Sequence, residues 1–279
     1  MRKITNELIE SFKNYLIEEE KSENTVEKYI RDISFFMAWV CGREVTKLLA
    51  LEYKKELCEK YAPASVNAAI SSLNSFFTFV EWYDIRIKAL KIQRQIFSSK
   101  DKELTKAEYE RLLTAANDKK NQRLYFLIQT IASTGIRVSE LRHITVSAVH
   151  SGQAVINCKG KTRVVILPKK LCKLLIEYIR KNDIKKGSVF VSRNGNPLDR
   201  SHIWKMLKAL CKTAGVSKDK VFPHNFRHLF ARTYYSMQKD IVRLADILGH
   251  SSVNTTRIYT IETGEVHRRQ IQKLGLLRC

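Results

Sequence analysis

Apolar residues recur every three or four positions through the first 82 residues, which is the spacing of one face of an α-helix. These stripes predict four helices joined by short polar links, over residues 5–20, 24–41, 47–60 and 62–82. Thr5 is a plausible cap for the first helix, and Pro63 suits the first turn of the fourth. We interpret the aromatic residues of the stripes as core rather than as a platform for stacked bases. A compact helical domain is therefore predicted over residues 1–90.

Helical spacing resumes after a polar stretch without periodicity, residues 91–103, which is interpreted as an interdomain linker. Thr105 and Glu108 form a capping-box pattern at the start of the second part, residues 104–279. Further helices are predicted over residues 105–117, 122–133, 169–181, 200–214 and 241–248, with others beginning at Ile136 and Pro223. The helix over residues 122–133 should end at Thr134-Gly135, where the glycine suits a helix C-terminus. The pattern ends in a basic amphipathic segment, residues 266–277.

The spacing of apolar residues changes in the middle of this second part. β-Branched runs over residues 153–158 and 163–167 flank a lysine-rich turn that contains Lys159 and Lys161, and they predict a hairpin. A third short strand is predicted over residues 189–191. The expected fold is therefore mainly α-helical with a small three-stranded antiparallel β-sheet.

Charge divides the chain at the same place as the helical pattern. The net charge of the 279 residues is +22, but residues 1–100 hold 16 Lys+Arg against 14 Asp+Glu. Residues 101–279 hold 34 against 14 and also contain all seven histidines. A positive field of this size favours a polyanion as partner, and nucleic acid is the usual one. A basic surface that is merely solvated is the alternative.

Several classes of protein are disfavoured by what the sequence lacks. It has no apolar run long enough to cross a bilayer and no signal-peptide core at the N-terminus, so we expect a cytoplasmic protein without a membrane partner. The six cysteines lack zinc-site spacing and are expected to be free thiols. Neither a glycine-rich phosphate loop nor a cluster of carboxylates for two Mg²⁺ ions is present. We expect no metal and no cofactor.

One stretch, residues 244–260, carries candidate chemistry. Its apolar run turns at Gly249, and His250 lies beside a Ser-Ser helix cap. Tyr259 follows nine positions later, so the imidazole and the phenol can point toward one place. A His–Tyr pair is weak evidence by itself, and its meaning depends on what the rest of the chain supplies.

Other polar residues stand where solubility does not explain them. Arg137 lies at a predicted helix start between apolar neighbours and needs an anionic partner, while Glu140 one turn later is placed to steady it. His224 and Arg227 are three positions apart and share a helix face. The hairpin turn adds a lysine, Lys159 or Lys161.

These residue types together suit phosphoryl transfer without a metal. Two guanidinium groups can clamp a phosphodiester and neutralise the charge that its transition state develops. A tyrosine can attack the phosphorus and hold it covalently. Phenols ionise only near pH 10, so the attack needs a nearby cation or base. A lysine can protonate the leaving oxygen.

Four motifs, in this order along the chain, resemble those of the tyrosine recombinase (phage integrase) family, and most closely its Xer-like bacterial site-specific recombinases. The motifs are Thr134-Gly-Ile-Arg-Val-Ser-Glu-Leu141, Lys159-Gly160, His224-Asn-Phe-Arg-His228 and Leu248-Gly-His-Ser-Ser-Val-Asn-Thr-Thr-Arg-Ile-Tyr259. The helical first domain also resembles the family's core-binding (SAM-like) DNA-binding domain, so the resemblance covers nearly the whole chain.

The resemblance implies a role for each matching residue. Arg137 and Arg227 would bind the scissile phosphate, and His250 would donate a hydrogen bond to one of its oxygens. Tyr259 would form a 3′-phosphotyrosine, and His224 would assist the transfer of the phenol proton. The stored bond energy would then allow religation without ATP or metal.

The remaining matches imply supporting roles. Lys159 would be the general acid toward the 5′-hydroxyl leaving group. Lys161 stays the alternative, because the Lys-Gly turn is shorter here than the usual Lys-Gly-x-Lys. Glu140 would support Arg137. His228 is common at its position in the family and is expected to be structural.

The resemblance also implies an architecture and a partner. Two domains would form a C-shaped clamp around duplex DNA that carries paired inverted repeats, and protomers would associate into dimers and tetramers on that DNA. Residues 266–279 would either dock on a neighbouring protomer or pack on their own domain. The implied activity is DNA integration, excision, inversion or dimer resolution. The alternatives are a catalytically silent DNA-binding regulator and an enzyme like the type IB topoisomerases.

Overall fold

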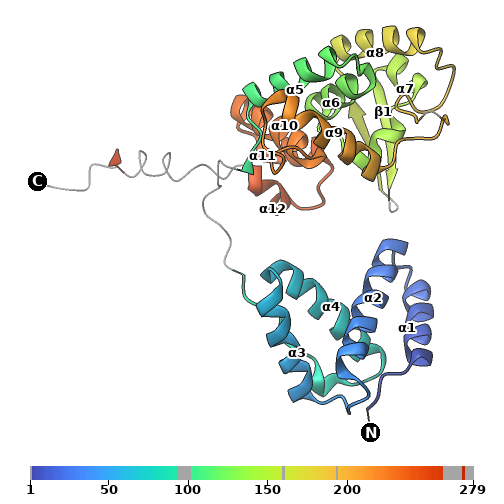
Figure 1. Ribbon diagram of the computed structural model, residues 1–279, viewed down its shortest axis with the longest axis vertical. Coiled ribbons are helices and arrows are strands. Elements are labelled where there is room, and N and C mark those ends of the chain that lie inside the picture. The colour runs from blue at the N-terminus through green and yellow to red at the C-terminus, as the bar shows by residue number, and fades with distance from the viewer. Residues whose placement is uncertain (1, 93–101, 159–160, 193, 260–271, 274–279) are drawn as a thin grey trace, which may run out of the picture. The chain divides into compact units, whose positions relative to one another are not determined.

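The computed structural model describes residues 2–92, 102–158, 161–192, 194–259 and 272–273 (Figure 1). The chain forms two compact units, Met1–Arg94 and Gln95–Cys279. Three predicted features lie wholly or largely outside the described residues: the linker over residues 91–103, Lys159 in the hairpin turn, and the C-terminal segment 266–279. Among the described residues, no helix combines the length and the apolar character that a membrane span requires.

The first unit is the predicted set of four helices. They are α1 (Asn6–Glu18), α2 (Glu23–Val40), α3 (Lys47–Lys60) and α4 (Pro63–Phe79), followed by a 3₁₀ turn, η1 (Tyr83–Ile85). The hydroxyl of Thr5 accepts a hydrogen bond from the backbone N–H of Leu8, which confirms the expected cap. The aromatic residues Phe12, Phe36 and Phe76 are fully buried, so the interpretation of the aromatic stripe as core is also confirmed.

The second unit is larger and holds the small sheet. Its helical elements are α5 (Lys106–Asp118), α6 (Gln122–Thr134), η3 (Val138–His143), α7 (Val146–Ser151), α8 (Lys169–Lys181), α9 (Arg200–Ala214), α10 (Pro223–Gln238), α11 (Ile241–Leu248), α12 (Val253–Thr256) and η4 (Arg257–Tyr259). The strongly apolar α6 contributes Leu127, Ile128 and Ile131 to the core with no exposed surface. Helix α10 packs against α6, and α11 and η4 pack against α10 (Figure 1). Residues distant in sequence are thereby brought together beside the end of α6.

Helix α6 ends where the sequence predicted. Gly135 adopts the left-handed conformation, with φ +64°, and its N–H bonds the carbonyl of Ile131. A Cβ at this position would lie 2.5 Å from the ring of Phe230 on α10, so the close approach also requires glycine. The helix predicted to begin at Ile136 is instead the 3₁₀ helix η3. Its first turn is held by the side chain of Glu140, which folds back onto the backbone N–H of Arg137.

The sheet differs from the prediction. Strands β1 (Gln153–Cys158) and β2 (Lys161–Ile166) form the predicted antiparallel hairpin, but the sheet among the described residues has two strands, not three. Residues 189–191 make only isolated bridges at their edges, one of which joins Val191 to Pro197. The backbone hydrogen bonds beside these bridges join Val189 to Ile144, Ser192 to Asn196 and Leu198 to Phe190, so the segment pairs with neighbouring loops and not with β1 or β2. Between η3 and β1 the chain forms the short helix α7, which was not predicted and which is capped by Thr145.

Candidate active site

Arg137 stands directly after the turn that ends α6. Its Nη1 lies 3.0 Å from Oε1 of Glu140, and its backbone N–H donates to the other carboxylate oxygen at 2.9 Å. Glu140 is buried, whereas the Arg137 side chain keeps 39% of its surface exposed. Arg137 can therefore reach a ligand from solvent while a buried carboxylate fixes its orientation.

The pKa of Glu140 lies below its ordinary value. Burial alone would raise this pKa, but the hydrogen bond from the Arg137 backbone, the charge of Arg163 and the hydrogen bonds from both guanidinium groups outweigh it. Glu140 is thus an anion at neutral pH, held between Arg137 and Arg163.

Arg227 lies on α10 and is almost completely buried, with 1% of its surface exposed. Its guanidinium donates to the carbonyl of Gly135 at 2.5 Å and to that of Leu248 at 2.7 Å. Burial and the nearby charge of Arg137 lower the pKa of Arg227 to about 10, which still leaves it a cation at neutral pH. Within the described part of the chain its Nε has no hydrogen-bond partner.

A third arginine, Arg163 on β2, belongs to the same cluster and was not among the sequence-predicted site residues. Its Nη2 lies 2.6 Å from Oε2 of Glu140, and its Nη1 donates to the carbonyl of Ile247 at 2.8 Å. We call Arg137, Arg163 and Arg227 the arginine cluster. Arg163 opens a run, residues 164–167, that is apolar on both faces of the strand, so alternation along the sequence did not single out the arginine.

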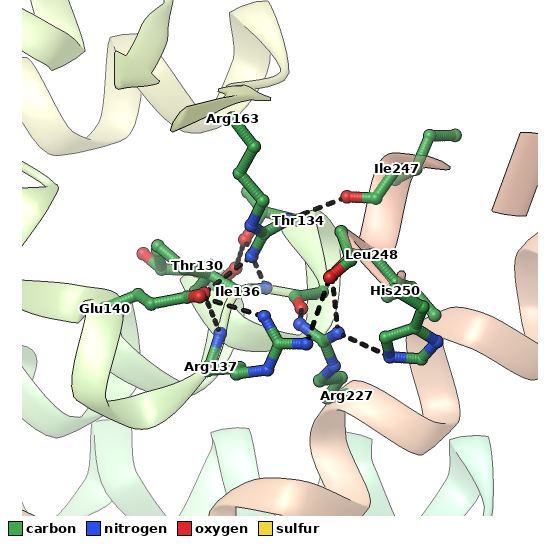
Figure 2. Close-up of polar contacts among 12 residues, drawn as sticks. Thr130, Thr134, Ile136, Arg137, Glu140, Arg163, Arg227, Ile247, Leu248 and His250 are labelled. Carbon is green, nitrogen blue, oxygen red and sulfur yellow. Dashed lines mark hydrogen bonds and ion pairs between the residues drawn. The ribbon is translucent and has the colours of Figure 1, made fainter. Parts of the chain in front are cut away.

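The end of α11 organises the arginine cluster (Figure 2). Its last carbonyl oxygens, those of residues 247–249, accept hydrogen bonds from Arg163, Arg227 and Arg137 in turn, the last at 3.4 Å. Carbonyls at a helix C-terminus have no partner within the helix and carry its partial negative charge. They therefore suit guanidinium groups, and each of the three comes from a different element.

His250 follows this turn and is oriented through both ring nitrogens. Arg227 donates to its Nε2 at 3.0 Å, and its Nδ1 lies 2.8 Å from the hydroxyl of Thr256. Because a guanidinium only donates, Nε2 must accept, and Nδ1 carries the proton that is donated to Thr256. Partial burial, with the charges of Arg227 and Arg137, lowers the pKa of His250 to about 4. The ring is neutral in the free protein.

Tyr259 ends η4 and is 3% exposed. Its ring meets that of His228 edge to face, with centroids 4.9 Å apart, and lies nearly parallel to that of His250 at 6.2 Å. Tyr259 is also near enough to Arg227 to oppose the lowering of that arginine's pKa. The phenol therefore lies beside the arginine cluster within the same protomer. The apolar part of its environment is supplied by Ala231, Leu244 and Leu248.

The two histidines of α10 lie in series. The rings of His224 and His228 are 4.4 Å apart, and the ring of His228 lies 4.9 Å from that of Tyr259. His224 is an exposed residue, but the part of its ring that meets the protein and the charges of Arg227 and Arg137 lower its pKa. Burial and the two neighbours on its own helix lower the pKa of His228 to about 4. Its buried Nε2 has no partner among the described residues.

Most of the sequence-predicted residues therefore lie together. The structure groups Arg137, Glu140, His224, Arg227, His228, His250 and Tyr259 around the end of α11. Lys159 lies outside the described residues, and only the backbone of Lys161 is described, at the start of β2. Sequence reasoning missed two members, Arg163 and Thr256. Thr256 is fully buried, but nothing in the surrounding Ser- and Thr-rich stretch distinguishes it from its neighbours.

Comparison with known proteins identifies the family of the chain. Residues 102–265 match the phage integrase family, and residues 9–83 match the N-terminal SAM-like domain of phage integrases. Tyrosine recombinase XerA of Thermococcus kodakarensis is 31% identical over 283 residues, covering 98% of this chain and 96% of that protein.

Solved structures agree in fold. The crystal structure of XerA recombinase has a TM-score of 0.54 at 28% identity and covers 99% of this chain and 100% of that one. XerH site-specific recombinase bound to its difH substrate, in a pre-cleavage complex, has a TM-score of 0.68 at 20% identity, with 91% and 92% covered. The chain belongs to the phage integrase family of tyrosine recombinases, among its Xer-like members.

Proposed function

We propose that the protein is a site-specific recombinase that cleaves and rejoins duplex DNA through a 3′-phosphotyrosine intermediate. The observation that carries this proposal is the convergence of the arginine cluster, His250 and Tyr259 at the end of α11. Membership of a family of tyrosine recombinases supports it.

Arg137 and Arg227 bind the scissile phosphate. Arg137 is partly exposed, and its 3.4 Å contact with the carbonyl of Gly249 is long enough for a phosphate oxygen to replace it. Two guanidinium groups on one phosphodiester neutralise charge that increases in the transition state, which lowers the barrier rather than merely tightening binding.

Tyr259 attacks the phosphorus, so that a bond forms between the phenolic oxygen and phosphorus while the bond to the 5′-oxygen breaks. The phenol proton passes to His224, the more exposed end of the histidine pair on α10. The 5′-oxygen leaves as a hydroxyl after taking a proton from Lys159, for which Lys161 is the alternative. Rejoining is the reverse attack by a 5′-hydroxyl, and the phosphotyrosine conserves the bond energy, so no ATP is consumed.

His250 donates a hydrogen bond to a phosphate oxygen only after it has gained a proton. In the free protein its Nε2 accepts from Arg227 and has nothing to donate. A bound phosphate places negative charge beside the ring, which raises the pKa of a histidine and favours the imidazolium. Thr256 then keeps the Nδ1–H bond, and Nε2–H faces the phosphate.

The DNA partner is duplex DNA with paired inverted repeats. Residues 1–90 serve as the core-binding domain and residues 104–279 as the catalytic domain, together forming a C-shaped clamp. Protomers associate into dimers and tetramers on the DNA, with residues 266–279 exchanged between neighbours. The excess of 34 Lys+Arg over 14 Asp+Glu in residues 101–279 supports a polyanionic partner.

The function is tested with the DNA that flanks the coding sequence. Inverted repeats found there are footprinted with the purified protein, then prepared as nicked suicide substrates that release a short fragment after cleavage. We expect a covalent adduct that survives denaturation, and peptide mapping should place the DNA 3′-phosphate on Tyr259. A footprint without any adduct would favour a silent regulator. Site-independent relaxation of supercoiled plasmids would favour a topoisomerase.

A further inference from the structure

Arg163 connects three parts of the site that come from different elements. It lies on β2, its carboxylate partner belongs to η3, and its carbonyl partner ends α11. We propose that Arg163 is a positioning residue for the phosphate site, which locks Arg137 and the turn before His250 into one rigid arrangement. This inference rests on the proposed function, because the phosphate site is part of it.

The connection to Arg137 runs through Glu140. One carboxylate oxygen of Glu140 holds Nη1 of Arg137 at 3.0 Å, and the other accepts from Nη2 of Arg163 at 2.6 Å. Arg163 then continues to the carbonyl of Ile247 at 2.8 Å. An unbroken chain of charge-assisted hydrogen bonds thus ties the exposed arginine to the end of α11. Without Arg163, Glu140 would keep only its bonds to Arg137.

The connection to His250 is steric. Gly249 has φ +64°, and a Cβ built on it would lie 2.3 Å from Cδ of Arg163. The backbone of the turn therefore rests directly on the aliphatic part of the arginine side chain. Because His250 is the next residue, Arg163 fixes the backbone position from which the His250 side chain extends.

Arg163 itself is not placed to bind DNA. Its side chain is 16% exposed, against 39% for Arg137, and the terminal nitrogens of its guanidinium are bonded to protein oxygens. Its contribution must pass through Arg137 and His250. Displacement of catalytic groups by about 1 Å can slow a reaction about 100-fold, so a residue of this kind can matter without touching substrate.

The first test compares Arg163→Gln and Arg163→Lys with wild type on the suicide substrate. We expect both variants to bind the DNA within about twofold of wild type, since the phosphate contacts that dominate affinity remain. Single-turnover cleavage by Arg163→Gln should be about 10- to 100-fold slower, and Arg163→Lys should lose less, because an ammonium can still reach one partner. Arg142→Gln is the matched control: Arg142 is an exposed arginine of η3, and its variant should cleave like wild type.

The second test separates positioning of the phosphate site from a general effect on folding. A methylphosphonate at the scissile position removes one negative charge, so cleavage depends less on the guanidinium groups that neutralise it. The defect of Arg163→Gln relative to wild type should therefore shrink about tenfold on this substrate, as should the defect of Arg137→Gln. If Arg163→Gln does not fold, the same comparison is made with Arg163→Lys.

Two results would overturn the inference while leaving the proposed function intact. One is wild-type cleavage by both Arg163 variants. The other is a defect of equal size on the phosphodiester and the methylphosphonate, which would make Arg163 a structural residue only. Absence of any adduct with the wild-type protein on a DNA that it footprints would instead contradict the proposed function.

Discussion

At the scale of single residues, the site is defined by which nitrogen donates to which oxygen. The assignment is unambiguous at His250, because Arg227 can only donate and the hydroxyl of Thr256 is left to accept. An imidazole surrounded by arginines would otherwise be free to rotate away from their charge. Thr256, buried and outside the sequence-predicted set, therefore fixes the orientation of the His250 ring.

Replacing Thr256 tests this assignment. Thr256→Val keeps the shape of the side chain but removes the acceptor, leaving Nδ1–H of His250 without its partner at a cost of about 1–3 kcal/mol. We expect single-turnover cleavage to fall about tenfold in Thr256→Val and to stay near wild type in Thr256→Ser, which retains the hydroxyl. Equal rates for the two variants would show that the hydrogen bond does not orient the ring.

The histidines also predict how stability depends on pH. The pKa values of His228 and His250 are lowered to about 4 in the folded protein, whereas an unfolded histidine titrates near 6.5. The unfolded state therefore binds more protons between these values, and the free energy of unfolding should fall as pH drops from about 6.5 to 4. Denaturant unfolding at a series of pH values measures this. His228→Phe, which keeps a ring against Tyr259, should flatten the decline, and an unchanged slope would contradict the assignment.

At the scale of elements, the short helix α11 does more than carry the chain toward Tyr259. Its C-terminal carbonyls accept hydrogen bonds from arginines of β2, α10 and the start of η3. The partial negative charge of this helix end therefore stabilises the three cations, as a bound anion would. The cluster of three cations is thereby held together before any DNA binds. Glycine at the C-cap avoids the strain of the left-handed conformation, and the close contact with Arg163 leaves no room there for a side chain.

Gly249→Ala should therefore be unusually costly. Gly215 provides the control, since it caps α9 with φ +59° and a Cβ there would meet nothing within 4 Å. Gly215→Ala should cost only the left-handed backbone strain, about 1–2 kcal/mol. Gly249→Ala should cost more, because it also displaces Arg163, and it should slow cleavage as well. Equal losses of unfolding free energy in the two variants, measured by denaturant titration, would refute the steric argument.

At the scale of the whole molecule, charge is the dominant property. The net charge of +22 lies almost wholly in residues 101–279, and the three arginines of the cluster account for only a small part of it. The remaining basic residues supply a field that attracts duplex DNA independently of its sequence. Contacts that distinguish one DNA sequence from another must supply binding energy beyond this sequence-independent attraction.

The dependence of DNA affinity on salt concentration measures this sequence-independent electrostatic attraction. Each phosphate that the protein neutralises releases counterions, so 6–10 such contacts correspond to a loss of about 10³- to 10⁵-fold in affinity between 50 and 200 mM salt. We expect a loss of at least about 10³-fold for the full chain on its footprinted site, measured by fluorescence anisotropy. Tyr259→Phe, which removes no charge, should give the same slope. Affinity that hardly changes with salt would contradict a predominantly electrostatic interaction.

Local patterns predicted local features well. The helical stripes, the cap at Thr5, the glycine end of α6 and the hairpin all follow from residues close together in sequence. Features that depend on distant partners were missed. Arg163 lies 23 residues from Glu140 and 84 residues from Ile247 along the chain. The pattern of an apolar strand carries no information about partners that far away. The predicted third strand was wrong for a related reason, since Ser188 and Val191 make isolated bridges to Thr145 and Pro197 rather than to the hairpin.

The central claim is that Tyr259 is the nucleophile, and its substitution tests that claim most directly. Tyr259→Phe removes only the phenolic oxygen, while Tyr234→Phe makes the same change at a tyrosine that packs against the same apolar cluster. On a suicide substrate of the footprinted site, wild type and Tyr234→Phe should form a covalent adduct that survives denaturation. Tyr259→Phe should leave the footprint intact and form none. An adduct formed by Tyr259→Phe would contradict the account.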